Sequence, residues 1–295
     1  MKWFLFKIVF IYPRIYSFFH YYRKKEWRKE FEDKAALFYK QKDPQRIKKT
    51  VKGISELRGV RKVMRYLIPH MDKQFLKRFV NVEGIHYLDQ ALKEKKGVVL
   101  MAGHIGVPHL AFNALRVMGY DVILLSGVTP KRPKHLTYRY YDTADNTIFV
   151  HDPSLAKTYK KRISDTLQSG GIIYYDADAG EGRASQEIAF LGVKMNFPTG
   201  MVYFAHQAEA TIIPFIHLYK RGKISLIFKE PVNNHWRRGK AEYNTIITEF
   251  AKLLEYYILK YPEQYLGIYG PTVLSYYYRS HHKAHLPSVE VKNEE

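Results

Sequence analysis

From about residue 80 onward, short apolar runs alternate with longer segments of helical periodicity. The apolar runs cover residues 97–102, 122–125, 171–175, 210–216 and 224–228. Strands without polar interruptions are typical of sheets covered on both faces, and strands that alternate with helices favour parallel pairing. The sequence therefore predicts an α/β domain with a mostly parallel central sheet covered by helices.

The segments between these runs repeat their apolar residues at helical intervals, for example over residues 107–118, 199–207 and 243–259. Residues 23–75 are highly charged and show the same spacing, which predicts amphipathic helices. The apolar positions there include Ile54, Leu57, Val60, Val63, Met64 and Leu67.

Charge and cysteine content limit the classes of function. The chain has 48 Lys and Arg against 28 Asp and Glu in 295 residues, so its basic surface should attract anionic partners such as phospholipid, nucleic acid, phosphorylated small molecules or acidic carrier proteins. It has no cysteine, which excludes disulfides, thiolate metal sites and a Cys nucleophile.

The first 25 residues form an aromatic, largely apolar segment that runs into Arg23-Lys24-Lys25. Because Pro13 interrupts it and Lys7 and Arg14 carry charge, it falls short of the roughly 20 clean residues of a spanning helix. We expect a retained anchor that lies in one leaflet with a basic edge at the cytoplasmic surface. An ordinary amphipathic helix packed on the core is the alternative.

No internal repeat or Pro/Gly-rich linker divides the chain, so one main domain with appendages is expected. The predicted boundaries are a membrane anchor over 1–25, an amphipathic helical region over 26–75, the α/β domain over 76–278, and a disordered polar tail over 279–295. Three histidines in the tail resemble a weak metal motif, but a solvated tail explains them better. No metal site is expected elsewhere.

His104 lies two residues beyond a predicted strand and just before a predicted helix. A helix N-terminus would keep the ring neutral, as a general base requires, and free N–H groups there could bind a developing oxyanion. Gly106 would permit close approach of a ligand to the backbone. A structural histidine satisfied by backbone groups is the alternative.

Asp176 and Asp178 directly follow another predicted strand and open a glycine-rich loop that contains Arg183. Ligands gather beyond the carboxyl ends of parallel strands, so these carboxylates and His104 are expected in one crevice. Two carboxylates and an arginine suit a site that orients a histidine and binds an anionic or hydroxyl-rich substrate. Thr199, farther along, is expected to cap a helix.

Five blocks taken in order resemble the bacterial lipid A biosynthesis acyltransferases, a branch of the glycerolipid acyltransferase superfamily. The blocks are Gly97 to Gly106 with its His-x-Gly ending, Asp176 to Gly182, Phe190-x-Gly192 followed by Pro198-Thr-Gly200, Ile212-Ile-Pro-Phe215, and Tyr261-Pro-Glu-Gln-Tyr265. The resemblance spans roughly residues 75–270.

The resemblance implies that His104 takes a proton from an acceptor hydroxyl, which attacks an acyl thioester directly. The family carries Asp or Glu where this chain has His109, so Asp178 or Asp176 must supply that charge, or the activity is altered. No cofactor is implied beyond the donor, which would be acyl carrier protein or an acyl coenzyme A thioester. Arg183, Lys131 and Arg132 are candidates for phosphate contacts, and Thr199 and Gly106 for substrate contacts.

The resemblance also implies anionic membrane lipids as partners, a lipid or glycolipid acceptor, and a place at the cytoplasmic face of a bacterial inner membrane. A non-enzymatic basic membrane or nucleic-acid binding protein is the main alternative. No nucleic acid partner is expected, because the chain carries no RNA-recognition, helix-turn-helix or zinc-finger signature. A Ser/His lipid hydrolase is disfavoured because no Gly-x-Ser-x-Gly elbow occurs.

Overall fold

The computed structural model describes residues 2–36, 43–126, 146–150, 153–178, 184–232 and 240–265. Contacts divide the chain into two compact units. One comprises residues 1–67, 187–195 and 252–295, and the other residues 68–186 and 196–251. The sequence-based boundaries at 25, 75 and 278 remain predictions, and the predicted tail of 279–295 lies outside the described residues.

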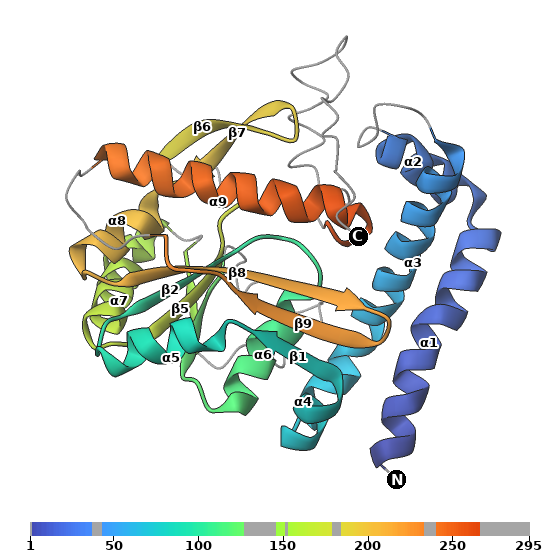
Figure 1. Ribbon diagram of the computed structural model, residues 1–295, viewed down its shortest axis with the longest axis horizontal. Helices are drawn as coiled ribbons and strands as arrows, with labels where there is room; N and C mark the ends of the chain where they lie inside the picture. Colours follow the sequence, from blue (N-terminus) through green and yellow to red (C-terminus); the bar gives the residue numbers. More distant parts are fainter. Residues whose placement is uncertain are drawn as a thin grey trace. The chain divides into compact units, whose positions relative to one another are not determined.

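A seven-stranded sheet forms the centre of the unit of residues 68–186 and 196–251 (Figure 1). Its strands are β1 (Val80–Glu83), β2 (Val98–Ala102), β3 (Val122–Ser126), β4 (Thr147–Phe149), β5 (Ile172–Asp176), β8 (Thr211–Lys220) and β9 (Lys223–Phe228). They lie in the order β1-β9-β8-β2-β5-β3-β4, and only the β8–β9 pair is antiparallel. This arrangement confirms the predicted α/β class and the mostly parallel sheet.

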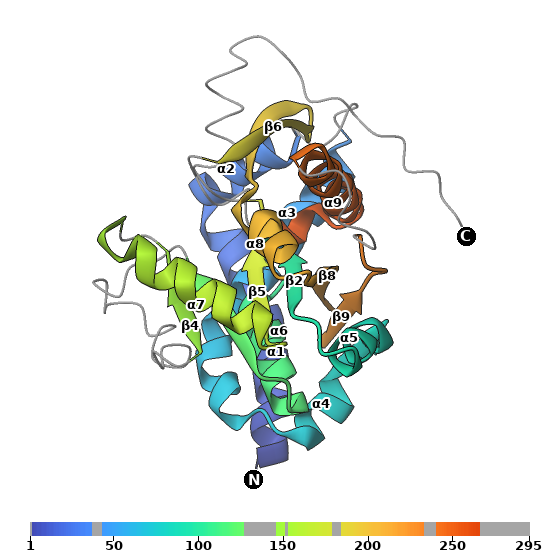
Figure 2. The same ribbon diagram turned by 90° about the vertical axis from the view of Figure 1, so that its left-hand side faces the viewer.

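Helices cover both faces of this sheet. They are α4 (Lys73–Phe79), α5 (Ile85–Lys93), α6 (Pro108–Met118), α7 (Ala156–Gln168), α8 (Gly200–Gln207) and the first part of α9 (Lys240–Lys260), with 3-10 turns η1 (Ile68–His70) and η3 (Pro153–Leu155). Figures 1 and 2 both show α6 and α8 on opposite sides of the strands. Because helices cover both faces, side chains on either face of the sheet are shielded from water. This explains why the strands carry continuous apolar runs.

The middle of the sheet is deeply buried. All five residues of β2 are fully buried, and β2 pairs in parallel with β8 on one side and β5 on the other. Each such aliphatic side chain contributes about 1.5–3 kcal/mol through burial. The rigid position of β2 in turn fixes the residues that follow its carboxyl end.

The sequence located the long strands well and the short ones poorly. All five apolar runs correspond to strands, and β8 extends beyond its run to Lys220. β1 and β4 were not predicted, because four and three residues give too little periodicity to recognise. The segment from Phe190 to Pro198, for which no strand was predicted, forms the end of β6 (Ser185–Phe190) and β7 (Val193–Pro198), which pair with each other.

Helices dominate the unit of residues 1–67, 187–195 and 252–295. They are α1 (Lys2–Arg23), α2 (Lys25–Ala36), α3 (Pro44–Leu67), the last part of α9 and the 3-10 turn η4 (Pro262–Gln264). Together with η1 and the start of α4, these helices confirm the predicted helical character in the described part of residues 23–75, and Ile54, Leu57 and Val60 are buried as their spacing required. Gly53 of α3 is needed because a Cβ there would lie 2.6 Å from the Glu263 side chain.

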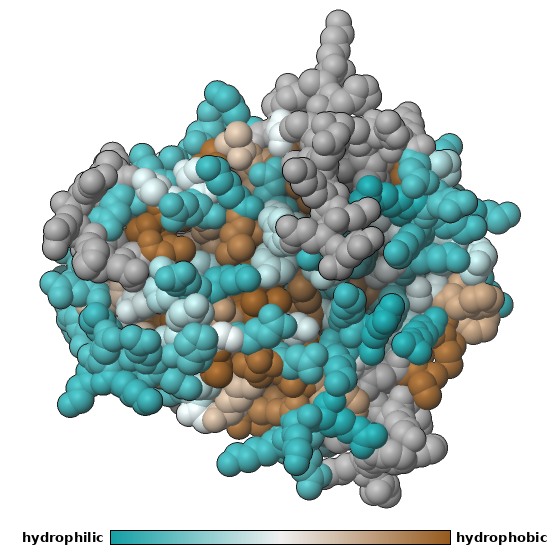
Figure 3. All heavy atoms as spheres, viewed as in Figure 1, coloured by the Kyte–Doolittle hydropathy of each residue, from teal (hydrophilic) through white to brown (hydrophobic). Residues whose placement is uncertain are grey.

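The helix α1 packs against α3 along one side only. On the packed side Tyr21 is buried, and the Ser17 hydroxyl donates to the backbone carbonyl of Lys52 at 3.2 Å. Large apolar side chains on the other side are open to solvent, and they are Ile11, Tyr12, Ile15, Phe18, Phe19 and Tyr22. Figure 3 shows apolar surface over α1. Among the described helices, none is both long enough and apolar enough to cross a bilayer.

Candidate active site

His104 lies in the turn that follows the buried strand β2. Ile105 and Val107 on this turn are fully buried and anchor it, whereas 38% of the His104 side chain stays exposed. The expected place two residues beyond a strand is confirmed. The helix α6 begins only at Pro108, however, so His104 precedes its first turn instead of belonging to it. The helix dipole therefore acts on the ring less directly than the sequence indicated, because its effect is confined to the terminal turn.

Gly106 is required by the protein backbone itself. Its φ is +67°, and a Cβ placed on it would lie 2.0 Å from the carbonyl oxygen of His217 on β8. The sequence interpretation assigned its close approach to a ligand. The close approach seen in the structure is between the turn and the neighbouring strand, and it sets the path of the chain from β2 to α6.

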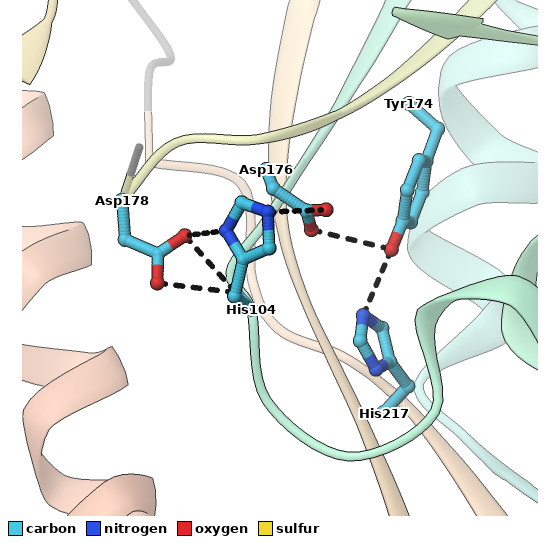
Figure 4. A network of polar contacts seen from close by, with 5 residues as sticks. All are labelled: His104, Tyr174, Asp176, Asp178 and His217. Carbon is cyan, nitrogen blue, oxygen red and sulfur yellow. Dashed lines mark hydrogen bonds and ion pairs between the residues drawn. The ribbon is translucent and has the colours of Figure 1, made fainter. Parts of the chain in front are cut away.

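Asp178 holds His104 through three contacts (Figure 4). Its Oδ1 lies 2.7 Å from His104 Nδ1, and the backbone N–H of His104 donates to Oδ1 at 3.0 Å and to Oδ2 at 3.1 Å. Only 1% of the Asp178 side chain is exposed. Because a carboxylate accepts hydrogen bonds, the neutral imidazole carries its proton on Nδ1 and leaves the lone pair of Nε2 available.

Asp176 approaches the opposite edge of the same imidazole. Its Oδ2 lies 3.6 Å from His104 Nε2, and 18% of its side chain is exposed. Burial raises the pKa of Asp176, the nearby Asp178 raises it further, and His104 together with a hydrogen bond from Tyr174 opposes the rise. The strand ends are tied together, since the Ala177 N–H donates to the Ala102 carbonyl at 2.7 Å. The predicted grouping of one histidine and two carboxylates beyond the strand ends is therefore present.

Two further polar residues stand behind Asp176, and the sequence analysis did not identify them. The Tyr174 hydroxyl lies 3.4 Å from Asp176 Oδ1 and 2.8 Å from His217 Nε2. Both residues are buried within strands, Tyr174 on β5 and His217 on β8. Their signal in the sequence was a polar group inside an otherwise apolar run, which costs free energy unless it is hydrogen-bonded.

The remaining predicted site residues are spread around this centre. His109 lies in the first turn of α6, where its carbonyl accepts a hydrogen bond from Asn113 at 2.9 Å, and it contributes to the lowering of the pKa of His217. Thr199 stands at the N-cap of α8, but its backbone is helical and its side chain makes no capping hydrogen bond, so the expected cap is absent. Arg183, Lys131 and Arg132 lie outside the described residues.

The donor set gives no indication of a metal. No group of three or more His, Asp or Glu side chains that could hold an ion occurs in the part of the chain that the structure describes. The three tail histidines of the weak metal motif, His281, His282 and His285, fall outside that part. His104, Asp176 and Asp178 form a centre of hydrogen-bonded and closely spaced polar groups with one partly exposed imidazole.

Comparison with known proteins gives one family match. The family model described as bacterial lipid A biosynthesis acyltransferase matches residues 57–269, which is more than half of the chain and includes every residue of this centre. No curated protein sequence matches the chain significantly. Among solved structures, the chain is similar to the crystal structure of the 1-acyl-sn-glycerophosphate (LPA) acyltransferase PlsC from Thermotoga maritima. The identity is 12%, the TM-score 0.40, and the alignment covers 88% of this chain and 99% of that one.

Proposed function

Because the chain belongs to the bacterial lipid A biosynthesis acyltransferase family, we propose that it moves a fatty acyl chain from an acyl thioester to a hydroxyl of a lipid A-like glycolipid or another lipid acceptor. Family membership makes the protein an acyltransferase. The acceptor, the donor and the identity of the catalytic base are the proposed parts. His104 is the proposed general base.

The observation that carries this proposal is the contact between Asp178 Oδ1 and His104 Nδ1 at 2.7 Å. A carboxylate at this position orients the imidazole and stabilises the imidazolium that forms when Nε2 takes a proton. The family places an acid at the position of His109. We propose that Asp178 supplies the missing negative charge, so that His109 adjusts the surroundings of the site instead of pairing with the base.

The proposed reaction needs no acyl-enzyme. Nε2 of His104 takes the proton of the acceptor hydroxyl while the oxygen attacks the thioester carbonyl carbon. The carbon–sulfur bond then breaks, and the imidazolium returns the proton to the thiolate, which leaves as a thiol. N–H groups in the first turn of α6 are proposed to hold the tetrahedral oxyanion. His104 ends the cycle neutral, as it began.

Substrate contacts are proposed for several residues around this centre. The donor would be acyl carrier protein or acyl coenzyme A, and the excess of 48 basic over 28 acidic residues suits the negative charge of either. Arg132, Lys131 and Arg183 are proposed to contact donor or headgroup phosphates. Gly106 and Thr199 are proposed to line the substrate path, and Asp176 to face the acceptor.

Membrane association is proposed through the exposed side of α1. Ile15 is 50% and Phe18 is 61% exposed, and such apolar side chains are stabilised by insertion at a lipid interface. Cations lie beside the aromatic rings of α1. Lys62 of α3 lies over the Tyr16 ring at 4.6 Å, and Arg23 of α1 lies over the Phe19 ring at 5.5 Å. The proposal places residues 1–25 in one leaflet on anionic lipid, at the cytoplasmic face of a bacterial inner membrane.

The test of the base is His104→Ala, assayed by transfer of radiolabelled palmitate from palmitoyl coenzyme A or palmitoyl carrier protein to extracted membrane lipids. We expect transfer to disappear while the circular dichroism spectrum and the melting temperature are unchanged. His86→Ala is the matched control, because His86 is exposed on α5 and belongs to no part of the site. Full activity of the His104→Ala variant would overturn the proposal.

The acceptor is to be identified by mass spectrometry of lipids from cells with the gene, without it, and with the His104→Ala variant. We expect one lipid class to lose one acyl chain in both the deletion and the variant. Loss of a chain from a lipid A precursor would identify the glycolipid acceptor, and loss from a phospholipid would identify a lysophospholipid. Unchanged lipids in all three strains would contradict acyl transfer to lipid.

A further inference from the structure

A chain of three polar side chains leads away from His104 into the core. Figure 4 shows Asp176 beside His104, Tyr174 beyond Asp176, and His217 beyond Tyr174. Asp176 Oδ2 faces His104 Nε2 at 3.6 Å, and the other carboxylate oxygen, Oδ1, lies 3.4 Å from the Tyr174 hydroxyl. The hydroxyl in turn lies 2.8 Å from His217 Nε2.

The charge states of the two inner residues are fixed by burial. Burial raises the pKa of Tyr174 well above its usual value, so its hydroxyl keeps its proton. Burial also lowers the pKa of His217 to about 3, opposed by a backbone hydrogen bond and by Asp178, whereas His104 and His109 add to the lowering. His217 is therefore a neutral imidazole with a single N–H at neutral pH.

The carboxylate of Asp176 sets the direction of the hydrogen bonds along this chain, because a carboxylate can only accept. The Tyr174 hydroxyl has one proton, and it donates that proton to Asp176 Oδ1. Its oxygen must then accept from His217, which requires the Nε2–H tautomer of His217. With Oδ1 engaged by Tyr174, Oδ2 is the oxygen left to face His104.

We propose that Tyr174 and His217 are positioning residues that hold the Asp176 carboxylate beside His104 Nε2, where it serves as a second counter-ion for the imidazolium. This inference rests on the proposed role of His104 as the base. The imidazolium would then lie between two carboxylates, with Asp178 at Nδ1 and Asp176 near Nε2. Such an arrangement compensates for a histidine at position 109, where the family has an acid.

A purely structural role would be better served by apolar residues. On β8 the neighbours of His217, Ile216 and Leu218, are apolar, and a phenylalanine at position 174 with an aliphatic residue at position 217 would fill the space without desolvating polar groups. The next residue offers a direct comparison within the same strand. Tyr175 is equally buried, but its hydroxyl has no hydrogen-bond partner in the described structure, so it stabilises no carboxylate.

The test measures the pKa of His104 by ¹⁵N NMR of the full chain in detergent micelles, with its signals assigned from their loss in His104→Ala. Asp176→Asn removes the second negative charge, so the pKa of His104 should fall by about one unit. Tyr174→Phe should lower it by a smaller amount, because Asp176 loses the hydrogen bond that favours its ionised form. In the wild-type protein, His217 should keep its proton on Nε2 throughout the titration above pH 5.

The matched control is Tyr175→Phe, which deletes the same hydroxyl one residue away and should leave the pKa of His104 unchanged. The double variant Tyr174→Phe/Asp176→Asn should give the same pKa as Asp176→Asn alone, because Tyr174 acts through Asp176. A merely structural effect of Tyr174 would add to that of Asp176→Asn. Equal shifts in Tyr174→Phe and Tyr175→Phe, or no shift in Asp176→Asn, would overturn the inference.

A variant that fails to fold does not end the test. His217→Gln keeps an N–H donor for the Tyr174 oxygen, whereas His217→Leu removes it, so the first should preserve the pKa of His104 and the second should lower it. Identical results from these two variants would also overturn the inference. Because the titration needs no substrate, its outcome is independent of the His104→Ala transfer assay that tests the proposed function.

Discussion

The carboxyl edge of the central sheet and the helix α1 depart from the usual distribution of residues in opposite ways. The sheet edge buries charge, since only 1% of the Asp178 side chain is exposed. The helix exposes apolar surface, since Phe18 is 61% and Ile11 is 53% exposed. Charged side chains are rarely buried unless they are paired, and extended apolar patches are rarely left open.

The difference shows how each region offsets its own cost. The buried carboxylate of Asp178 is stabilised inside the protein by the backbone N–H and ring of His104. The exposed side of α1 differs, because its large apolar side chains remain open to solvent in the described structure while its packed side contacts α3. One departure is therefore offset within the fold, and the other is the surface that we propose binds a membrane.

The largest effect is expected from Asp178→Asn. The amide would present an N–H to His104 Nδ1, which forces the imidazole proton onto Nε2 and removes both the lone pair and the counter-charge. By analogy with other histidine–aspartate pairs, acyl transfer should fall by about 10³- to 10⁴-fold. Radiolabelled transfer to membrane lipids measures it, with the His104 tautomer followed by ¹⁵N NMR.

Asp165→Asn is the control for this change. Asp165 pairs with Lys161 on the surface of α7, so the same substitution there should leave transfer at the wild-type rate. Transfer by Asp178→Asn at the wild-type rate would mean that the buried carboxylate is only a structural feature of the turn.

The sequence predicted which strand ends carry the polar residues of the site better than it predicted how the site is built. Strand ends at Ala102 and Asp176 could be placed because apolar runs stop there, and parallel pairing then brings the following residues together. Tyr174 and His217 could not be placed in contact, because β8 is separated from β5 by β2 and the order of strands is a property of tertiary structure. The role of Gly106 was missed for the same reason, since its neighbour His217 is far away in the chain.

In the helical unit, periodicity identified the helices but not their exposed sides. In α3 the recurring apolar positions identified buried residues, because most of the other residues of this helix are polar or charged. In α1, apolar residues occur all around the helix, so the sequence alone could not show which of them face α3 and which face outward.

A smaller effect, on stability, is expected at the turn that carries His104. Gly106→Ala should destabilise the protein by about 3 kcal/mol or more, because a positive φ and a clash with the His217 carbonyl act together. Gly119→Ala is the matched variant, since its φ is +103° but nothing lies within 4 Å of the added Cβ. It should cost about 1 kcal/mol from strain alone. Urea unfolding measures the loss of stability in both variants. Equal losses would show that the contact with β8 is not the reason why position 106 requires glycine.

The exposed side of α1 should control membrane binding without affecting the fold. Replacing Ile15, Phe18 and Phe19 together with Ser should weaken binding to vesicles containing phosphatidylglycerol by about 10²-fold, since each lost side chain contributes up to about 1 kcal/mol at an interface. The melting temperature should change little because these side chains are open to solvent. The control replaces Tyr66, Leu155 and Tyr203, which are exposed elsewhere, and should bind as the wild type does. Unchanged binding by the α1 variant would contradict the proposal that the exposed side of α1 binds the membrane.

The smallest effect is a change of stability with pH, which is expected from one histidine with a lowered pKa in each region. The pKa of His217 is lowered to about 3 and that of His20 on α1 to about 4, in both cases chiefly by burial. A histidine whose pKa is lowered in the folded state binds its proton mainly in the unfolded state, so stability is full above the unfolded pKa near 6.5 and is lost as pH falls below it.

Lowering the pH from 7 to 5 should reduce the free energy of unfolding by about 2 kcal/mol through the fully buried His217. The His217→Gln variant should lack this part of the pH dependence. His20→Gln should reduce the dependence less, because solvent reaches the His20 ring and screens the cations Arg58, Lys62 and Lys24 around it. Urea unfolding at the two pH values measures both variants. A larger effect at His20 than at His217 would reverse the comparison, because the helical unit would then hold the more strongly desolvated polar group.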